Sequence, residues 1–379
     1  MGVRVRGRVE PGYETVAEAF AEYLAETRGG AAFSATVDGV AVVDLWGGSR
    51  DDGDRPWEAD TLQILFSGSK VLIAVCLLLL LERGELRLDA PIAAYWPEFA
   101  AAGKGDVTVA ELVSHRARLP GVRTPFPSDP APDGALAAKL LAEQPREDDP
   151  ALELAYHGIT FGWLCGELIR RVDGRTVGAL FHEEFAVPLG LDIWLGLPAD
   201  LEPRVGQVRY GPGWRGRAPA PAGSARLNLA DSVWANPLIF PEHDIPWNRP
   251  AWHRVEIPSS NAIGTARSMA RLFGALLGGE TPLSPATLAL GTTPLSGGFD
   301  AVFKRPMRYG VGLQLQTELG HLGPHPAAFG HDGSGGGVHA AWPSHAAAIS
   351  FVPNELHRSR GLYAPVGRIL TALHRVLGS

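Results

Sequence analysis

The most pronounced hydrophobic pattern in the chain is an unbroken run of eleven apolar residues, 71–81. A helix that is apolar on every side is buried on every side. The run is too short to cross a membrane, which takes about 20 residues. We therefore expect a central buried helix. The polar segment 66–70 at its N-terminal end should lie on the floor of a cleft.

Strand patterns occur near both ends of the chain. Segments 32–37 and 40–46 flank Asp38-Gly39, a dipeptide typical of hairpin turns because both residues accept positive φ. Strand-like segments return at 309–316, 338–342 and 346–352. Helical spacing of apolar residues predicts helices over 16–27, 107–114, 135–143, 159–172, 177–185, 264–277 and 363–377. Thr108 with Glu111 forms a capping box at the start of the second of these helices.

Strands at both ends and helices between them favour an α/β (α+β) protein with one antiparallel sheet flanked by helices and an inserted helical lobe. At 379 residues the chain exceeds the usual size of a single core. We expect a discontinuous sheet domain, 1–80 and 259–379, and a mainly helical and loop lobe, 81–258, that forms the cleft wall. Within 197–258 the tryptophans, Trp234 among them, would either line the cleft or fill the core of an irregular subdomain.

Composition and charge narrow the function classes. Hydrophobic residues make up 45% of the chain and charged residues 20%, which is typical of a soluble globular protein. The net charge is −7 and the arginines are scattered, so a nucleic-acid partner is not expected. Cys76 and Cys165 each lie in an apolar helical pattern and are typical of buried residues in a reducing compartment. Residues 1–13 contain no apolar leader, so we expect a cytoplasmic protein without a membrane partner.

The segment before the apolar run carries the first candidate chemistry. Of the four lysines, only Lys70 has a serine three residues upstream, Ser67, and residues at that spacing share a helix face. A serine hydroxyl becomes a useful nucleophile when a neighbouring base takes its proton, and a buried lysine can be that base. The alternative is that Ser67 caps the helix and Lys70 is solvated, which places an isolated cation directly before eleven apolar residues.

Such chemistry needs a further proton carrier and donors for an oxyanion. Tyr156 is the first candidate carrier, and His157 is a rival because its pKa suits acid–base work. The glycine-rich segment 330–337 allows close backbone approach, so the N–H of Ser334 would face the N–H of Ser67 across a carbonyl oxygen.

Other templates do not match the sequence. The segment 330–337 lacks the glycine spacing of a dinucleotide loop, and no G-x-S-x-G elbow surrounds any serine. The twelve histidines show no H-E-x-x-H or Cys-His zinc spacing, and His115 is interpreted as structural. We therefore expect neither a metal nor a cofactor.

At this point the chain resembles the serine β-lactamase and penicillin-recognising superfamily, particularly class C β-lactamases and family VIII carboxylesterases. The resemblance covers nearly the whole length and rests on several motifs in the right order. They are Leu45-Trp-Gly-Gly48, Ser67-x-x-Lys70, Leu112-Val-Ser-His115 with Leu119-Pro-Gly121, Tyr156-His-Gly-Ile-Thr-Phe-Gly-Trp163, Asn261-x-x-Gly-Thr-Ala266 and Gly330-His-Asp-Gly-x-Gly-Gly336.

The resemblance implies a β-lactamase/transpeptidase-like fold, Ser67 as the acylated nucleophile, Lys70 as its proton acceptor and Tyr156 as a base and acid shared with Lys70. It also implies an oxyanion hole formed by the backbone amides of Ser67 and Ser334.

Two departures from the lactamase pattern bear on the substrate. Tyr-x-Asn becomes Tyr156-His157-Gly158, and Lys-Thr-Gly becomes His331-Asp332-Gly333. We expect His157, His331, Gly333 and Trp234 to bind substrate. A neutral or partly charged histidine suits uncharged esters better than β-lactams.

The sequence thus predicts a serine carboxylesterase for small acyl esters with little or no β-lactamase activity. An acyltransferase that passes the acyl group to an alcohol or amine, and an inactive scaffold or binding relative, are the alternatives.

Overall fold

The computed structural model describes residues 4–53, 55–220, 223–358 and 361–378. Its strands are β1 (Val5–Val9), β2 (Gly30–Val37), β3 (Val40–Gly48), β4 (Gln63–Ile64), β5 (Ile193–Trp194), β6 (Arg209–Tyr210), β7 (Ile263–Gly264), β8 (Ser296–Asp300), β9 (Arg305–Tyr309), β10 (Gln314–Leu315), β11 (Phe329–Gly333), β12 (Gly337–Trp342), β13 (Ala347–Pro353) and β14 (Glu355–Leu356). Its α-helices are α1 (Glu14–Glu26), α2 (Lys70–Glu82), α3 (Val109–Val113), α4 (Gly134–Glu143), α5 (Thr160–Asp173), α6 (Val177–Phe181), α7 (Val187–Leu189), α8 (Leu229–Trp234), α9 (Pro250–Arg254), α10 (Ala266–Gly278), α11 (Pro285–Thr292) and α12 (Ala364–Leu377).

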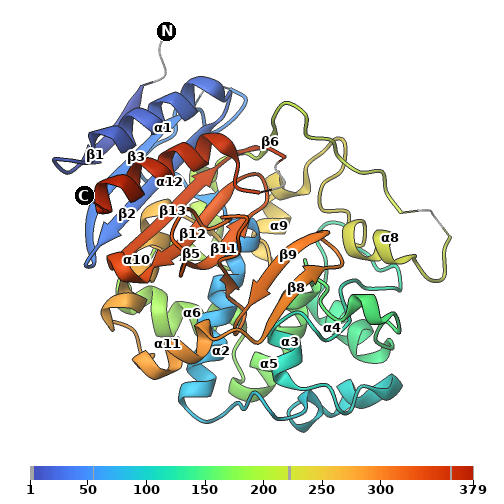
Figure 1. The fold of residues 1–379 in the computed structure, drawn as a ribbon. Helices are drawn as coiled ribbons and strands as arrows, with labels where there is room; N and C mark the ends of the chain where they lie inside the picture. The colour runs from blue at the N-terminus through green and yellow to red at the C-terminus, as the bar shows by residue number, and fades with distance from the viewer. Residues whose placement is uncertain (1–3, 54, 221–222, 359–360, 379) are drawn as a thin grey trace.

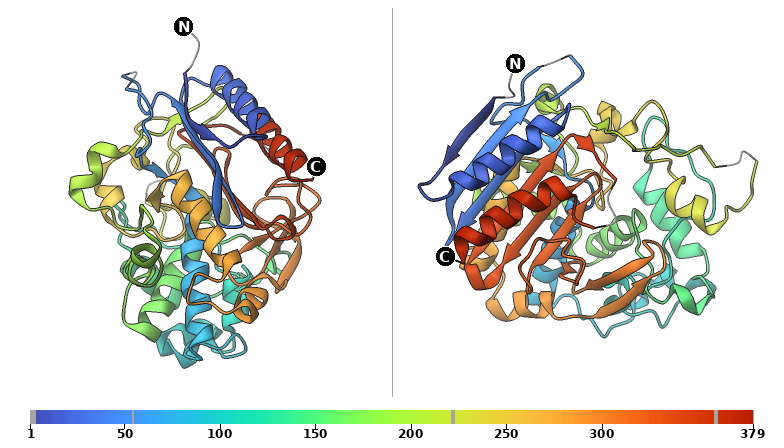
Figure 2. Two further views of the ribbon diagram at one scale, coloured as in Figure 1. Left: turned by 90° about the vertical axis from the view of Figure 1, so that its left-hand side faces the viewer. Right: turned by 45° about the horizontal axis from the view of Figure 1, so that its top comes forward.

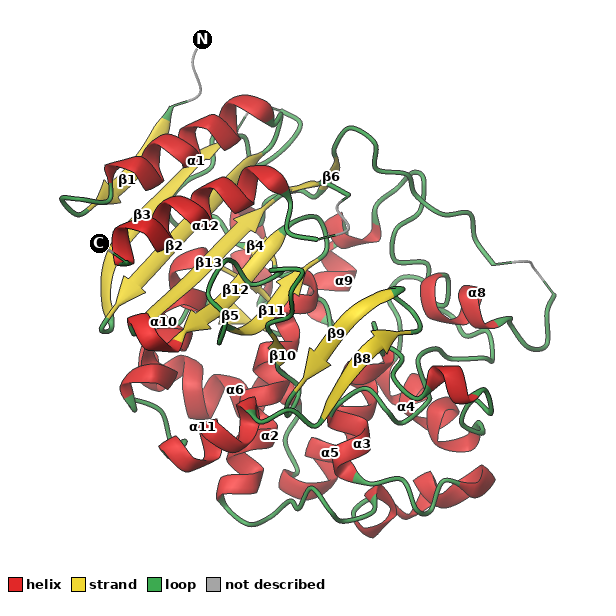
Figure 3. Ribbon diagram, in the orientation of Figure 1, coloured by secondary structure: helices red, strands yellow, loops and turns green. Residues whose placement is uncertain are grey.

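One large antiparallel sheet is built from the two ends of the chain. Its strand order is β1-β3-β2-β13-β12-β11-β10-β9-β8, so strands from the first 48 residues pair with strands from the last third through β2 and β13. The remaining chain supplies the helices and loops that lie against this sheet (Figures 1 and 3). This arrangement confirms the predicted fold class, whereas the division into 1–80 with 259–379 and 81–258 stays a prediction.

Helices cover both faces of the sheet. The two terminal helices α1 and α12 lie side by side on one face, and α10 packs under β2 and β13 on the other (Figure 2). Apolar residues at helical spacing on α1, such as Phe20 and Leu24, are fully buried against the sheet. Tyr23 meets the ring of Phe351 edge-on at 4.9 Å. The amphipathic patterns at the two termini therefore seal one side of the sheet.

Helix α2 runs through the middle of the molecule, as its apolar sequence predicts (Figure 1). Every residue from Lys70 to Leu80 is buried, and α5, α6 and α11 pack around the helix. Because no face meets solvent, the N-terminal end of α2 has a fixed position next to β11, an interior strand of the sheet.

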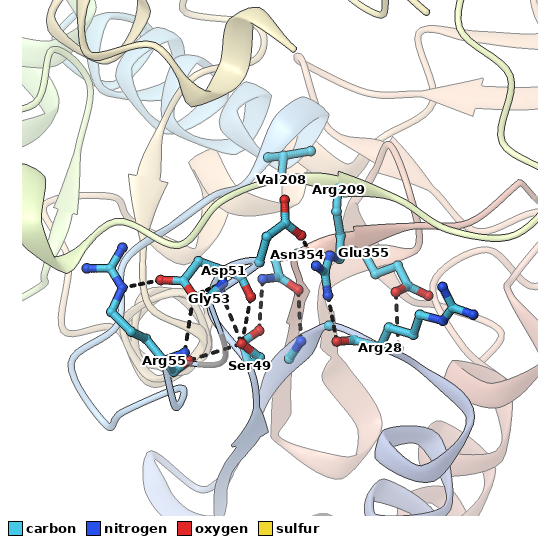
Figure 4. Close-up of polar contacts among 12 residues, drawn as sticks. Arg28, Ser49, Asp51, Gly53, Arg55, Val208, Arg209, Asn354 and Glu355 are labelled. Atoms are coloured by element: carbon cyan, nitrogen blue, oxygen red, sulfur yellow. Dashed lines mark hydrogen bonds and ion pairs between the residues drawn. The ribbon is translucent and has the colours of Figure 1, made fainter. Parts of the chain in front are cut away.

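A polar network ties the two ends of the chain together beside the sheet (Figure 4). The side-chain amide of Asn354, which is fully buried, accepts a hydrogen bond from the N–H of Gly30 at 2.8 Å and donates one to the carbonyl of Ser49 at 3.0 Å. The Arg209 guanidinium donates to the carbonyl of Arg28 at 2.7 Å. These contacts hold the start of β2, the loop after β3 and the end of β13 in one place.

The predicted strand 309–316 is wrong in its extent. Strand β9 ends at Tyr309 and β10 begins at Gln314, because Gly312 adopts φ +68° and turns the chain between them. The β8–β9 hairpin was not predicted, since the sequence around Gly297-Gly298 lacks a clear alternation of apolar and polar residues.

Candidate active site

The turn that presents Ser67 is a 3₁₀ helix, Phe66–Ser69, that leads directly into α2. Phe66 has φ +48°, a strained conformation for a residue with a side chain, and its ring packs against Phe240 and Trp247. Gly68 has no room for a side chain, because a Cβ there would lie 2.3 Å from Cδ2 of His339. The turn is therefore held from both sides and places Ser67, which is half-buried, at the cavity wall.

Lys70 lies at the centre of the site and is completely buried. Its Nζ is 3.3 Å from Ser67 Oγ, and it donates hydrogen bonds to the carbonyls of Gly158 at 2.8 Å and Ser259 at 3.2 Å. Burial holds the pKa of the Lys70 amine well below its ordinary value of 10.5, and the negative charge of Asp332 opposes this shift. A neutral amine has two N–H groups, which the two carbonyls satisfy, and one lone pair, which remains for the Ser67 hydroxyl.

Tyr156 contacts the same hydroxyl, and Lys70 Nζ lies over its ring, 4.7 Å from the centroid. Its Oη donates to Ser67 Oγ at 2.8 Å, and its ring stacks on Phe303 at a centroid distance of 4.4 Å. Burial raises the pKa of the Tyr156 phenol above its ordinary value of 10. The phenol is therefore protonated at rest and can give up a proton.

A cavity of about 680 Å³ opens in front of these groups. Of the residues predicted from the sequence, Ser67, Tyr156, Trp234, Gly333 and Ser334 all line it. Its remaining wall is strongly aromatic and includes Phe66, Trp214, Phe240, Trp247 and Phe303.

The tryptophans of 197–258 were expected either to line the cleft or to fill a core, and the structure shows some in each position. Trp214, Trp234 and Trp247 line the cavity, whereas Trp252 is not among the lining residues and is 2% exposed in the core.

His157 does not occupy the substrate-binding position predicted for it. Its side chain is fully buried, with Nε2 accepting from the N–H of Leu119 at 3.0 Å and Nδ1 lying 2.6 Å from the carbonyl of Ala155. Burial lowers the pKa of His157 to about 4. Both ring nitrogens are occupied by backbone groups, so this histidine fixes the loop before α5. His115, interpreted as structural, accepts from the N–H of His157 at 3.1 Å.

His331 also lies behind the cavity wall rather than in it. It is 1% exposed, its Nδ1 is 2.7 Å from the carbonyl of Asp332, and burial lowers its pKa to about 4. Successive side chains of a strand point to opposite faces, so on β11 it is Asp332 that lines the cavity. The prediction that His331 contacts substrate is therefore not supported by its position, because the neighbouring Asp332 lines the cavity and His331 does not.

Sequence reasoning missed several residues that build the site. The carbonyls of Gly158 and Ser259 hold Lys70, and Phe303 supports Tyr156. Asp332 faces the cavity and lies 3.4 Å from the Arg305 guanidinium. The Asp332 carboxylate was visible inside the glycine-rich segment, but backbone carbonyls leave no signal in a sequence.

Within the described ranges, no group of three or more His, Cys, Asp or Glu side chains is arranged to hold a metal ion. No helix in the described part of the chain is both long and apolar enough to span a bilayer. The cytoplasmic location stays a prediction.

Comparison with known proteins defines the class. The family model described as Beta-lactamase matches residues 16–372, and the chain belongs to this family.

Among curated relatives, the chain is 33% identical over 367 residues to "Esterase/beta-lactamase LipL" of Mycobacterium tuberculosis, which covers 94% of this chain and 84% of that protein. Among solved structures, it is similar to a family VIII carboxylesterase, with 32% identity, a TM-score of 0.85 and coverage of 98% of this chain and 100% of the other. It is also similar to EstA from Arthrobacter nitroguajacolicus Rue61a, with 30% identity, a TM-score of 0.84 and coverage of 100% and 99%. These findings confirm the resemblance drawn from the motifs and support a serine hydrolase.

Proposed function

We propose that the chain is a serine carboxylesterase that cleaves small acyl esters through an acyl-Ser67 intermediate. The observation that carries the proposal is the position of Ser67 Oγ, 3.3 Å from Lys70 Nζ and 2.8 Å from Tyr156 Oη at the wall of a cavity. Relatives described as esterases, at about one third identity, support the same reaction class.

Acylation begins when Lys70 Nζ accepts the hydroxyl proton of Ser67 while Oγ attacks the ester carbonyl carbon. Negative charge develops on the carbonyl oxygen, and the backbone N–H groups of Ser67 and Ser334 are the proposed donors to it. The C–O bond to the alcohol breaks, Tyr156 gives its proton to the leaving oxygen and recovers one from Lys70. Water then attacks the acyl-Ser67 ester, its proton passes to the same pair, and the acid leaves as the serine hydroxyl is restored.

Little β-lactamase activity is proposed. Gly158 supplies no side-chain amide for an acylamino group, and His331 is a buried, neutral ring where the lactamase motif has a lysine. A chromogenic cephalosporin tests this point, and turnover as fast as that of simple esters would contradict it.

Pre-steady-state hydrolysis of 4-nitrophenyl butyrate tests the esterase proposal. A burst of 4-nitrophenolate and an acyl adduct on the Ser67 peptide are expected, and both should be lost in Ser67→Ala. Ser334→Ala is the matched control, because it removes a cavity-lining hydroxyl but keeps the backbone N–H proposed for the oxyanion hole. Absence of a burst in the wild-type protein, together with no fluorophosphonate adduct on Ser67, would leave the inactive scaffold instead.

Acyl transfer is a second candidate for the same site. The aromatic wall beside Ser67, which includes Trp214 and Trp247, favours it because an apolar acceptor could pack there and exclude water. Product ratios measured in the presence of added alcohols would reveal it, with transfer outrunning hydrolysis.

A further inference from the structure

The cavity in front of Ser67 has a charge opposite to that of the protein as a whole. The chain carries a net charge of −7, yet among the described residues the cavity is lined by several cationic side chains and only one carboxylate, Asp332. The cations are Arg215, Arg217, Lys304, Arg305 and Arg358. Asp332 lies 3.4 Å from Arg305, so the single acidic group is already matched by one of them.

The other four cations are not matched in this way. Over the part of the chain that the structure describes, no carboxylate forms an ion pair with Arg215, Arg217, Lys304 or Arg358. Elsewhere on the surface the arginines are commonly paired, and Arg175 alone contacts three carboxylates. Cations left without counter-charges around a concave, low-dielectric wall raise the local concentration of anions.

Two of these cations, Arg217 and Lys304, lie next to aromatic residues of the cavity wall, and we call this pair the cationic rim. The Arg217 guanidinium lies over the Trp234 ring at 5.7 Å, and its backbone N–H donates to the carbonyl of Phe240 at 2.8 Å. Lys304 is at the tip of the β8–β9 hairpin with φ +56°, directly after Phe303, whose ring stacks on Tyr156. The Trp234 and Phe303 rings are 6.4 Å apart, so the cationic rim lies beside two neighbouring aromatic rings of the cavity wall.

We infer that the physiological substrate is an ester bearing a carboxylate at the end remote from the scissile bond, which the Arg217 and Lys304 rim recognises. The inference rests on the proposed esterase function and narrows its substrate class. The sequence favoured uncharged esters because no fixed cation lies at the His331 position next to the reacting carbonyl. The His331 ring is buried behind the cavity wall, whereas the side chains of Arg217 and Lys304 are exposed and line the cavity.

The test compares two esters that have the same leaving group and six-carbon acyl chains, 4-nitrophenyl hexanoate and mono-4-nitrophenyl adipate, each corrected for uncatalysed hydrolysis. Wild-type kcat/KM should favour the adipate at low ionic strength, and added salt should reduce this preference because it screens the rim. In Arg217→Gln/Lys304→Gln the ratio of adipate to hexanoate kcat/KM should fall by about threefold to tenfold, as expected for two screened charges. Arg308→Gln is the control, because Arg308 is an exposed arginine of β9 that does not line the cavity.

A second measurement separates this inference from the proposed function. Ser67→Ala should bind the adipate more tightly than the hexanoate, followed by quenching of tryptophan fluorescence, whether or not the wild-type protein turns either ester over. Equal kcat/KM and equal binding for the two esters, or the same ratio in the rim and control variants, would overturn the carboxylate assignment while leaving the esterase intact. Selective binding without any Ser67-dependent hydrolysis would overturn the esterase instead.

Discussion

Gly68 lies between the proposed nucleophile and its base, and its replacement tests how tightly that turn is held. A Cβ at this position would lie 2.3 Å from Cδ2 and 2.6 Å from Nε2 of His339. The His339 ring cannot move aside easily, because it is fully buried and its Nδ1 lies 2.8 Å from Ser350 Oγ. Gly68→Ala must therefore displace either the ring or the turn.

The expected magnitude follows from two opposing effects. Gly68 does not have a positive φ, so alanine alone would stabilise the helical turn by up to about 1 kcal/mol. Overpacking a core typically costs about 1–3 kcal/mol, so the clash should prevail. A displacement of about 1 Å at a reacting atom can cost roughly 100-fold in rate. Expressed as free energies, the increase in the activation barrier should therefore exceed the decrease in the free energy of unfolding.

Burst amplitude and kcat for 4-nitrophenyl butyrate, with thermal unfolding in parallel, measure both effects. The double variant Gly68→Ala/His339→Ala makes room for the new methyl group, so it should recover much of the activity that the single variant loses. Gly105→Ala is the control, because a Cβ there meets only Ala100 at an ordinary distance of 3.6 Å. Full activity in Gly68→Ala, or a double variant that is no better than the single one, would refute the reasoning.

Two further predictions concern pH and the network beside the sheet. Burial lowers the pKa of Lys70, so kcat/KM for an ester should rise with pH as this amine loses its proton, at a pH well below the ordinary lysine pKa of 10.5. Asp332→Asn removes the negative charge that opposes this pKa shift, so the rise in kcat/KM should move to lower pH. A rise near pH 10 in both proteins would contradict this prediction. Asn354→Ala leaves the N–H of Gly30 and the carbonyl of Ser49 without their partner. Urea denaturation should therefore show that the free energy of unfolding falls by about 2–3 kcal/mol. A fall below about 0.5 kcal/mol would show that water replaces the side-chain amide.

The elements that could be predicted from the sequence are those whose signal is local. The apolar run before Glu82, the capping box at Thr108 and the hairpin at Asp38-Gly39 each appear where the pattern indicates. Ser67 and Lys70 could also be found, because residues three apart are neighbours in any helical turn.

The parts that could not be predicted depend on contacts distant in sequence. Which of two adjacent residues of β11 faces the cavity depends on strand pairing, and this decides between His331 and Asp332. The burial of Lys104 could not be predicted for the same reason. Its amine donates to three backbone carbonyls, two of them about 40 residues away, and nothing in the sequence distinguishes it from a surface lysine.

The roles within the site follow from what burial does to each group. Lys70 and Tyr156 are both enclosed, so burial disfavours the ammonium of one and the phenolate of the other. The resting pair is therefore a neutral amine, which can accept the Ser67 proton, and a neutral phenol, which can donate one to a leaving group. Burial thus lowers the pKa of the Lys70 amine and raises the pKa of the Tyr156 phenol, and this shared cause supports the proposed roles of Lys70 as the base and Tyr156 as the acid.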